Sequence, residues 1–121
     1  MSSDQFQLTF KVLKTAFKKY EKNLTIKTNT IDKYHLYAGY SEKYKKDIYF
    51  GGLEIKKNYV SFHLMPVYIH PELLSSISSD LKKRMQGKSC FNFKEIDKTL
   101  LRELSGLTSK GYEYFKKEGM L

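Results

Sequence analysis

The first apolar pattern along the chain has a helical period. Between residues 6 and 20, apolar residues recur at spacings of four, three, four and three. This spacing places them on one side of an α-helix, so we predict an amphipathic helix here. Its apolar stripe consists of Phe6, Phe10, Leu13, Phe17 and Tyr20.

From residue 24 the period changes to two, which is typical of strands with one buried face. Leu24 and Ile26 alternate with Thr25 and Lys27, and a longer alternation covers residues 34–40. We therefore predict strands at 24–27 and 34–40, followed by a charged loop over 41–47.

Residues 48–66 carry the clearest strand pattern. Asn58 tolerates the left-handed conformation of a tight turn, so we predict a hairpin that reverses at Lys57-Asn58. A shift of one residue would set Leu53 against Ser61, so the pattern itself selects the register. The pairs expected on the buried face are Ile55–Val60, Leu53–Phe62 and Gly51–Leu64. The pairs expected on the opposite face are Glu54–Ser61, Gly52–His63 and Phe50–Met65.

The C-terminal half predicts a short helix that begins at Pro71, a strand over 88–93 and a last helix capped by Asp97. The polar segment Ser78-Ser79-Asp80 is a candidate break that would divide the first of these helices in two. Four consecutive strands require an antiparallel sheet, and amphipathic helices require an apolar sheet face to cover. We predict a single α+β domain over residues 1–121. It is a two-layer sandwich of about five antiparallel strands, with the N-terminal, middle and C-terminal helices on one face. Its predicted core comprises Phe6, Phe10, Leu13, Phe17, Leu53, Ile55, Val60, Phe62, Leu64, Leu104 and Leu107.

Composition narrows the class of protein. With 40% hydrophobic and 15% aromatic residues, the 121-residue chain is too apolar to be disordered despite its net charge of +9. It lacks a run of about 18 apolar residues, so no membrane span is expected. Its single cysteine cannot form an internal disulfide, and we expect a cytoplasmic protein.

The positive charge raises nucleic-acid binding as an alternative function. Of the 22 basic residues, however, only Arg84 and Arg102 are arginines, and the lysines are scattered along the chain. Base and phosphate recognition favours the bidentate guanidinium group, and scattered lysines are typical of a solvated surface. The composition therefore favours other partners, either a small molecule or a protein.

Catalytic and metal-binding patterns are weak. Cys90 is the only thiol, and catalysis would require a base nearby, for which His63 is the candidate. The other histidines are His35 and His70, and no two of the three have the helical i, i+4 spacing of a metal site. The sequence implies no cofactor.

Gly52 is the most informative position for a ligand site. Glycine weakens the interior of a strand, so it indicates a bulge or a close approach to the backbone. In the predicted register, Gly52 leaves space beside His63, unless a side chain such as Tyr37 fills it. The candidate ligand site on this face comprises Tyr37, Phe50, Gly52, His63 and Met65.

Three segments together show a family resemblance: residues 49–52 (YFGG), 60–64 (VSFHL) and 85–93 (MQGKSCFNF). They resemble the uncharacterised bacterial DUF1801, or YdhG-like, family. The resemblance runs from the hairpin to about residue 115 and implies a frataxin-like α+β fold. It implies no established reaction, although some relatives are described as iron carriers for iron–sulfur or haem assembly.

The iron role does not transfer with the fold. Frataxin binds iron through an acidic ridge on its first helix and edge strand, whereas the first helical region here has only Asp4 and Glu21 among five lysines. Hard cations require clustered carboxylates. We expect a non-enzymatic binding or adaptor protein, with an iron carrier, a nucleic-acid-binding protein and a small enzyme built on Cys90 and His63 as alternatives.

Overall fold

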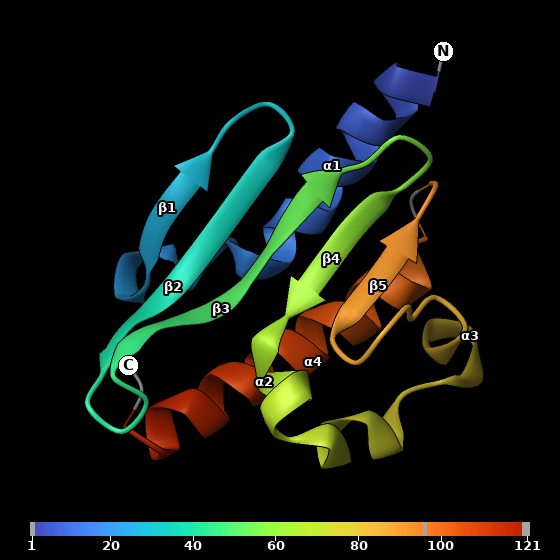
Figure 1. Ribbon diagram of the computed structural model, residues 1–121. Coiled ribbons are helices and arrows are strands. Elements are labelled where there is room, and N and C mark those ends of the chain that lie inside the picture. The colour runs from blue at the N-terminus through green and yellow to red at the C-terminus, as the bar shows by residue number, and fades with distance from the viewer. Residues whose placement is uncertain (1, 96, 120–121) are drawn as a thin grey trace.

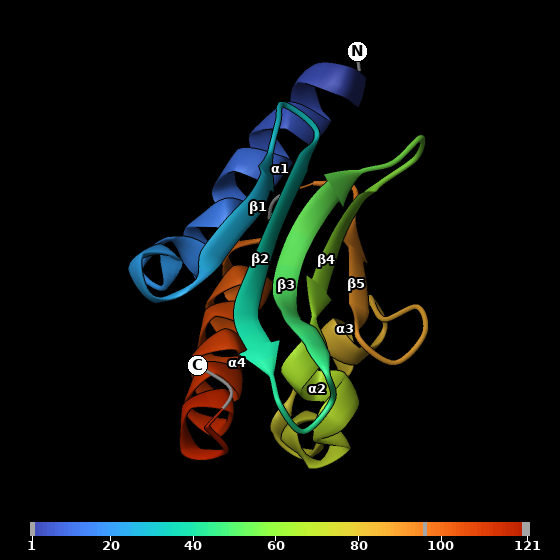
Figure 2. The same cartoon turned by 60° about the vertical axis from the view of Figure 1, so that its left-hand side comes forward.

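A computed structural model describes residues 2–95 and 97–119. Its centre is a five-stranded antiparallel sheet in the order β1-β2-β3-β4-β5, and two long helices cover one face (Figure 1, Figure 2). The predicted α+β sandwich is confirmed. The elements in chain order are α1 (Ser2–Lys18), η1 (Glu21–Asn23), β1 (Thr25–Asn29), β2 (Lys33–Ser41), β3 (Lys46–Ile55), β4 (Val60–Leu64), α2 (Met65–Ile69), η2 (Pro71–Ser76), α3 (Ser79–Lys82), β5 (Cys90–Phe93) and α4 (Lys98–Lys117).

The core lies between the sheet and helices α1 and α4. Phe17 of α1 is fully buried, and its ring stacks on Phe62 of β4 with the ring centroids 4.8 Å apart. Every predicted core residue is buried except Ile55, which is partly buried against the same cluster. Helix α4 begins as predicted, because the Asp97 carboxylate accepts a hydrogen bond of 3.0 Å from the N–H of Leu100.

The predicted β3–β4 register is confirmed at five pairs, from Ile55–Val60 to Gly51–Leu64. The sixth pair, Phe50–Met65, does not form, because β4 ends at Leu64 and Met65 begins helix α2. Pro66 occupies the first turn of α2, where its missing N–H leaves no hydrogen bond unmade.

A bulge between β2 and β3 changes the direction of Phe50. Leu36 pairs with Gly51 but Tyr37 pairs with Tyr49, so Phe50 is an extra residue in β3. Its side chain is 0% exposed and packs edge-on against the ring of Phe115. The prediction that Phe50 lies on the open face is therefore wrong, since strict alternation does not survive a bulge.

The helix predicted from Pro71 is interrupted at the expected position, since η2 ends at Ser76 and α3 begins at Ser79, and a short helix that the sequence did not predict, α2, precedes them. These segments lie at one end of the sheet beside α4 (Figure 1). Gly111 of α4 permits the close approach of α2, because a Cβ atom there would lie 2.7 Å from Pro66 Cβ. This contact places α2 against α4, directly after the last residue of β4.

No helix within the described ranges combines the length and apolar character needed to cross a membrane.

Candidate functional site

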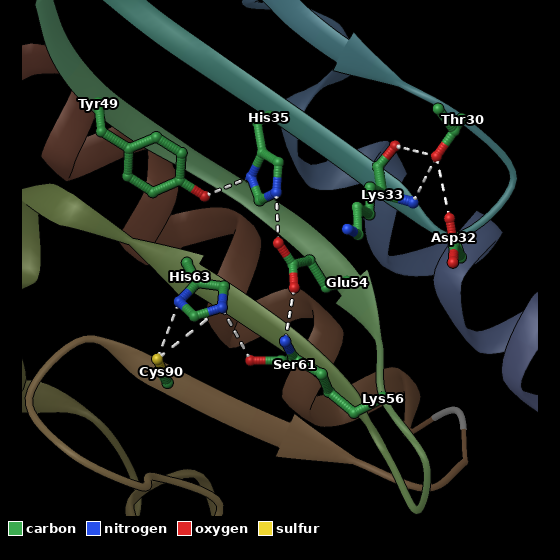
Figure 3. Close-up of polar contacts among 10 residues, drawn as sticks. All are labelled: Thr30, Asp32, Lys33, His35, Tyr49, Glu54, Lys56, Ser61, His63 and Cys90. Carbon is green, nitrogen blue, oxygen red and sulfur yellow. Dashed lines mark hydrogen bonds and ion pairs between the residues drawn. The ribbon is translucent and has the colours of Figure 1, made fainter.

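The sheet face opposite α1 and α4 carries a row of polar side chains (Figure 3). Alternation along β3 places them there. A Cβ atom on Gly51 would meet Phe17 of α1, whereas one on Gly52 would meet the side chains of His35 and Tyr49. Leu53 then returns to the core and Glu54 to the open face.

His35 of β2 is the centre of the first polar cluster. Its Nδ1 lies 2.8 Å from the Tyr49 hydroxyl, and its Nε2 lies 2.7 Å from a Glu54 carboxylate oxygen. The acceptor-only carboxylate requires Nε2 to carry a proton, so in the neutral ring Nδ1 accepts from Tyr49. Lys56 donates to the other Glu54 oxygen over 2.6 Å. These contacts hold one imidazole orientation at the middle of the face.

The ionisation of this cluster follows from its partners. The hydrogen bond from Lys56, assisted by the one from His35, outweighs partial burial and lowers the pKa of Glu54. Burial, with the nearby Glu54 charge, raises the pKa of the Tyr49 phenol. The carboxylate therefore stays charged, and the phenol keeps the proton that it donates to His35.

The space expected beside Gly52 is filled by the protein itself. A Cβ atom there would collide with the backbone oxygen of Tyr34, and it would lie 2.6 Å from His35 Nδ1 and 2.8 Å from the Tyr49 hydroxyl. Gly52 thus accommodates the His35–Tyr49 pair. There is no open depression for a ligand at this position. The alternative that the protein fills the space is confirmed, although His35 and Tyr49 fill it and not Tyr37.

A second cluster joins Cys90 to His63, as the sequence suggested. His63 of β4 pairs with Cys90 of β5, and the sulfur lies 2.8 Å from His63 Nδ1. His63 Nε2 lies 3.1 Å from the hydroxyl of Ser61. A neutral ring satisfies both contacts, accepting from the thiol at Nδ1 and donating from Nε2.

Electrostatics keep this pair uncharged. Burial raises the pKa of the Cys90 thiol and lowers the pKa of the His63 imidazole. A nucleophilic cysteine requires the opposite, a thiolate stabilised by an imidazolium or another cation. The adjoining hollow is also small, about 150 Å³. The thiol and the imidazole are close enough to form a catalytic pair, but their displaced pKa values do not favour the reactive thiolate.

We expect the Cys90 thiol to react slowly with iodoacetamide at pH 7. Because its pKa is raised, the alkylation rate should keep increasing above pH 8.5, roughly the ordinary thiol value. The measurement is a pH series of alkylation rates by mass spectrometry. The same chain unfolded in urea is the control and should show the ordinary thiol profile. A half-maximal rate below pH 7 in the folded protein would instead indicate an activated thiolate and favour an enzyme.

A larger cavity adjoins these clusters, where the β2–β3 turn faces helix α2. We call it the tyrosine hollow, and its volume is about 620 Å³. Tyr37 and Tyr49 meet edge to face on its sheet side, with their ring centroids 5.3 Å apart. Its aromatic and aliphatic lining includes Tyr37, Tyr44, Ile48, Tyr49, Met65, Tyr68 and Ile69.

The five residues predicted to form one ligand site lie in different places in the structure. Tyr37 and Met65 line the tyrosine hollow, and His63 lies in an adjoining depression of about 320 Å³ that Tyr37 also lines. Gly52 is covered by side chains, and Phe50 lies in the core on the opposite side of the sheet.

Sequence reasoning missed three tyrosines of the hollow. Tyr49 was missed because the bulge exchanges its orientation with that of Phe50. Tyr44 lies in the segment predicted to be only a charged loop, and Tyr68 lies on the unpredicted helix α2. The proline at residue 66 was the one available signal for a helix that carries Tyr68.

In residues 2–95 and 97–119, no three His, Cys, Asp or Glu side chains gather closely enough to hold a metal ion.

Comparison with known proteins does not identify the chain. It matches no family model, no curated protein and no solved structure. Function must therefore be inferred from the geometry of the open face.

Proposed function

We propose that this protein is a non-enzymatic binding protein that takes a small organic ligand in the tyrosine hollow. The observation that carries the proposal is the hollow itself. Its volume of about 620 Å³ falls within the range of small-molecule sites, which is roughly 300–1,000 Å³. Its aromatic lining, next to a fixed row of polar groups, is also typical of such sites.

The surrounding contacts support binding over catalysis. Tyr49 contributes its ring to the hollow while its hydroxyl is held by His35. The wall is thereby prearranged, which lowers the entropy lost when a ligand binds. The thiol–imidazole pair of Cys90 and His63 lies in a separate, smaller hollow, and its two pKa values are displaced away from the charged, nucleophilic form.

Binding of 2-naphthol, a neutral bicyclic probe, tests the proposal. We expect NMR shift changes at the tyrosine hollow and about tenfold weaker affinity in Tyr68→Ala, because aromatic contact is lost. Tyr68 is 54% exposed, so its removal should leave the fold intact. Tyr40→Ala is the matched control, since Tyr40 is 59% exposed and lies outside the hollow. Equal loss in both variants would refute the proposal, as would the absence of binding by 2-naphthol and by its charged analogues.

We extend the proposal to the family of this chain, its fold relationship and its cellular location. We propose that the chain is a member of the DUF1801 family with a frataxin-like fold, on the three segments quoted above. A cytoplasmic location is supported by the free thiol of Cys90.

Two alternatives remain as proposals with less support. An iron carrier would require carboxylate ligands, and the acidic groups on the open face are already engaged, as Glu54 is by His35 and Lys56. Nucleic-acid binding would rely on the lysines, of which Lys27 already pairs with Asp47.

A further inference from the structure

We propose that the ligand of the tyrosine hollow is a planar aromatic anion, such as an aromatic carboxylate or an aryl phosphate. This inference rests on the proposed function and assigns the chemical class of the ligand. It follows from two features of the hollow: rings that can stack on a planar group, and ammonium groups around them.

One lysine ammonium group lies over each of three of the four tyrosine rings. Lys27 Nζ lies 4.5 Å from the centroid of the Tyr37 ring, and Lys43 Nζ lies 5.4 Å from that of Tyr44. Lys88 Nζ lies 6.0 Å from the centroid of the Tyr68 ring.

A fourth lysine, Lys46, belongs to the lining itself. We call the aromatic and aliphatic lining of the hollow its floor, and the four lysines at or beside it (Lys27, Lys43, Lys46 and Lys88) its cationic rim.

The acidic residues nearby do not cancel this charge. Asp47 lines the hollow, but its carboxylate accepts a hydrogen bond from Lys27. Glu42, on the same β2–β3 turn, lies 3.9 Å from Lys45.

Among the described residues, Lys43, Lys46 and Lys88 have no carboxylate partner. These three ammonium groups are available to an incoming anion.

A ligand must carry both an aromatic ring and a negative charge to use the tyrosines and the lysines of the hollow together. An inorganic anion alone would gain only solvent-exposed lysine contacts, which contribute little. A neutral ring would stack on the tyrosines but leave the lysines without a partner. A cation would be repelled by the rim. An aromatic anion satisfies the floor and the rim together.

A charge series on one ring system tests the inference. The probes are 2-naphthoate, 2-naphthyl phosphate, 2-naphthol and 2-naphthylmethylammonium, measured by calorimetry, with NMR shifts to locate each. We expect one of the anions to bind about five- to tenfold more tightly than 2-naphthol, and the ammonium probe to bind most weakly. Comparison of the two anions distinguishes a carboxylate from a phosphate ligand. Increasing salt from 25 to 300 mM should weaken anion binding and leave 2-naphthol unchanged.

Two matched variants separate the rim from the general positive charge. The double variant Lys46→Gln/Lys88→Gln should weaken binding of the preferred anion about tenfold and leave 2-naphthol unchanged. Lys11→Gln/Lys18→Gln removes the same charge from α1, on the opposite face of the sheet, and should have little effect. Equal loss in both double variants would overturn the inference in favour of nonspecific attraction.

The outcomes also separate this inference from the proposed function. If 2-naphthol binds in the hollow as tightly as the anions, or the ammonium probe binds best, the ligand class is wrong and the binding site stands. If none of the four probes shifts the hollow residues, both proposals fail.

Discussion

Replacing Phe50 by alanine is expected to lower the free energy of unfolding by about 3–5 kcal/mol, as for other fully buried phenylalanines. The ring is inaccessible to solvent and lies among Phe17, Tyr112 and Phe115, with centroid separations of 6.2, 6.1 and 5.5 Å. Its removal would leave a cavity at the centre of the helix–sheet interface. Urea denaturation followed by circular dichroism measures the loss.

Tyr40→Ala is the control for Phe50→Ala. Tyr40 is also an aromatic residue of the sheet but is largely exposed, so its loss should change stability by no more than about 0.5 kcal/mol. If Phe50→Ala also costs less than about 1 kcal/mol, Phe50 lies on the open face, and the bulge in β3 is misplaced.

Gly52→Ala is expected to destabilise the fold by about 1–3 kcal/mol or more, although alanine has the higher strand propensity. The added methyl group would collide with the backbone oxygen of Tyr34 in the neighbouring strand, and with the paired side chains of His35 and Tyr49. A backbone atom cannot rotate away, so β2 and β3 must separate locally. The measurement is again urea denaturation.

Gly106→Ala provides the opposite expectation in the same chain. Gly106 lies on the exposed side of α4, and no heavy atom would lie within 4 Å of an added Cβ. Alanine should therefore raise stability by about 0.5–1 kcal/mol through helix propensity. If Gly52→Ala is as stable as the natural chain, the His35–Tyr49 pair does not occupy the position that the structure gives it.

The site shows where sequence reasoning succeeded and failed. The pairing of Gly52 with His63 was predictable, because the aliphatic residues of β3 and β4 share a face only in that register. The contact between His63 and Cys90 was anticipated as a possibility. The filling of the Gly52 space by His35 was not, because it depends on how β2 pairs with β3, where two bulges shift the register.

Local periodicity by itself determined the α+β class, the apolar stripe of α1, the β3–β4 hairpin and the cap at Asp97. Each depends on residues close together in sequence, where side-chain direction follows from a period of 3.6 or 2. The tertiary structure alone decided that Phe50 enters the core, that α2 begins at Met65, and that Tyr68 lines the same hollow as Tyr37 and Tyr49. The position of a bulge is chosen by the packing of the whole sheet against α1 and α4, so the hollow that we propose as a binding site forms only when those distant segments meet.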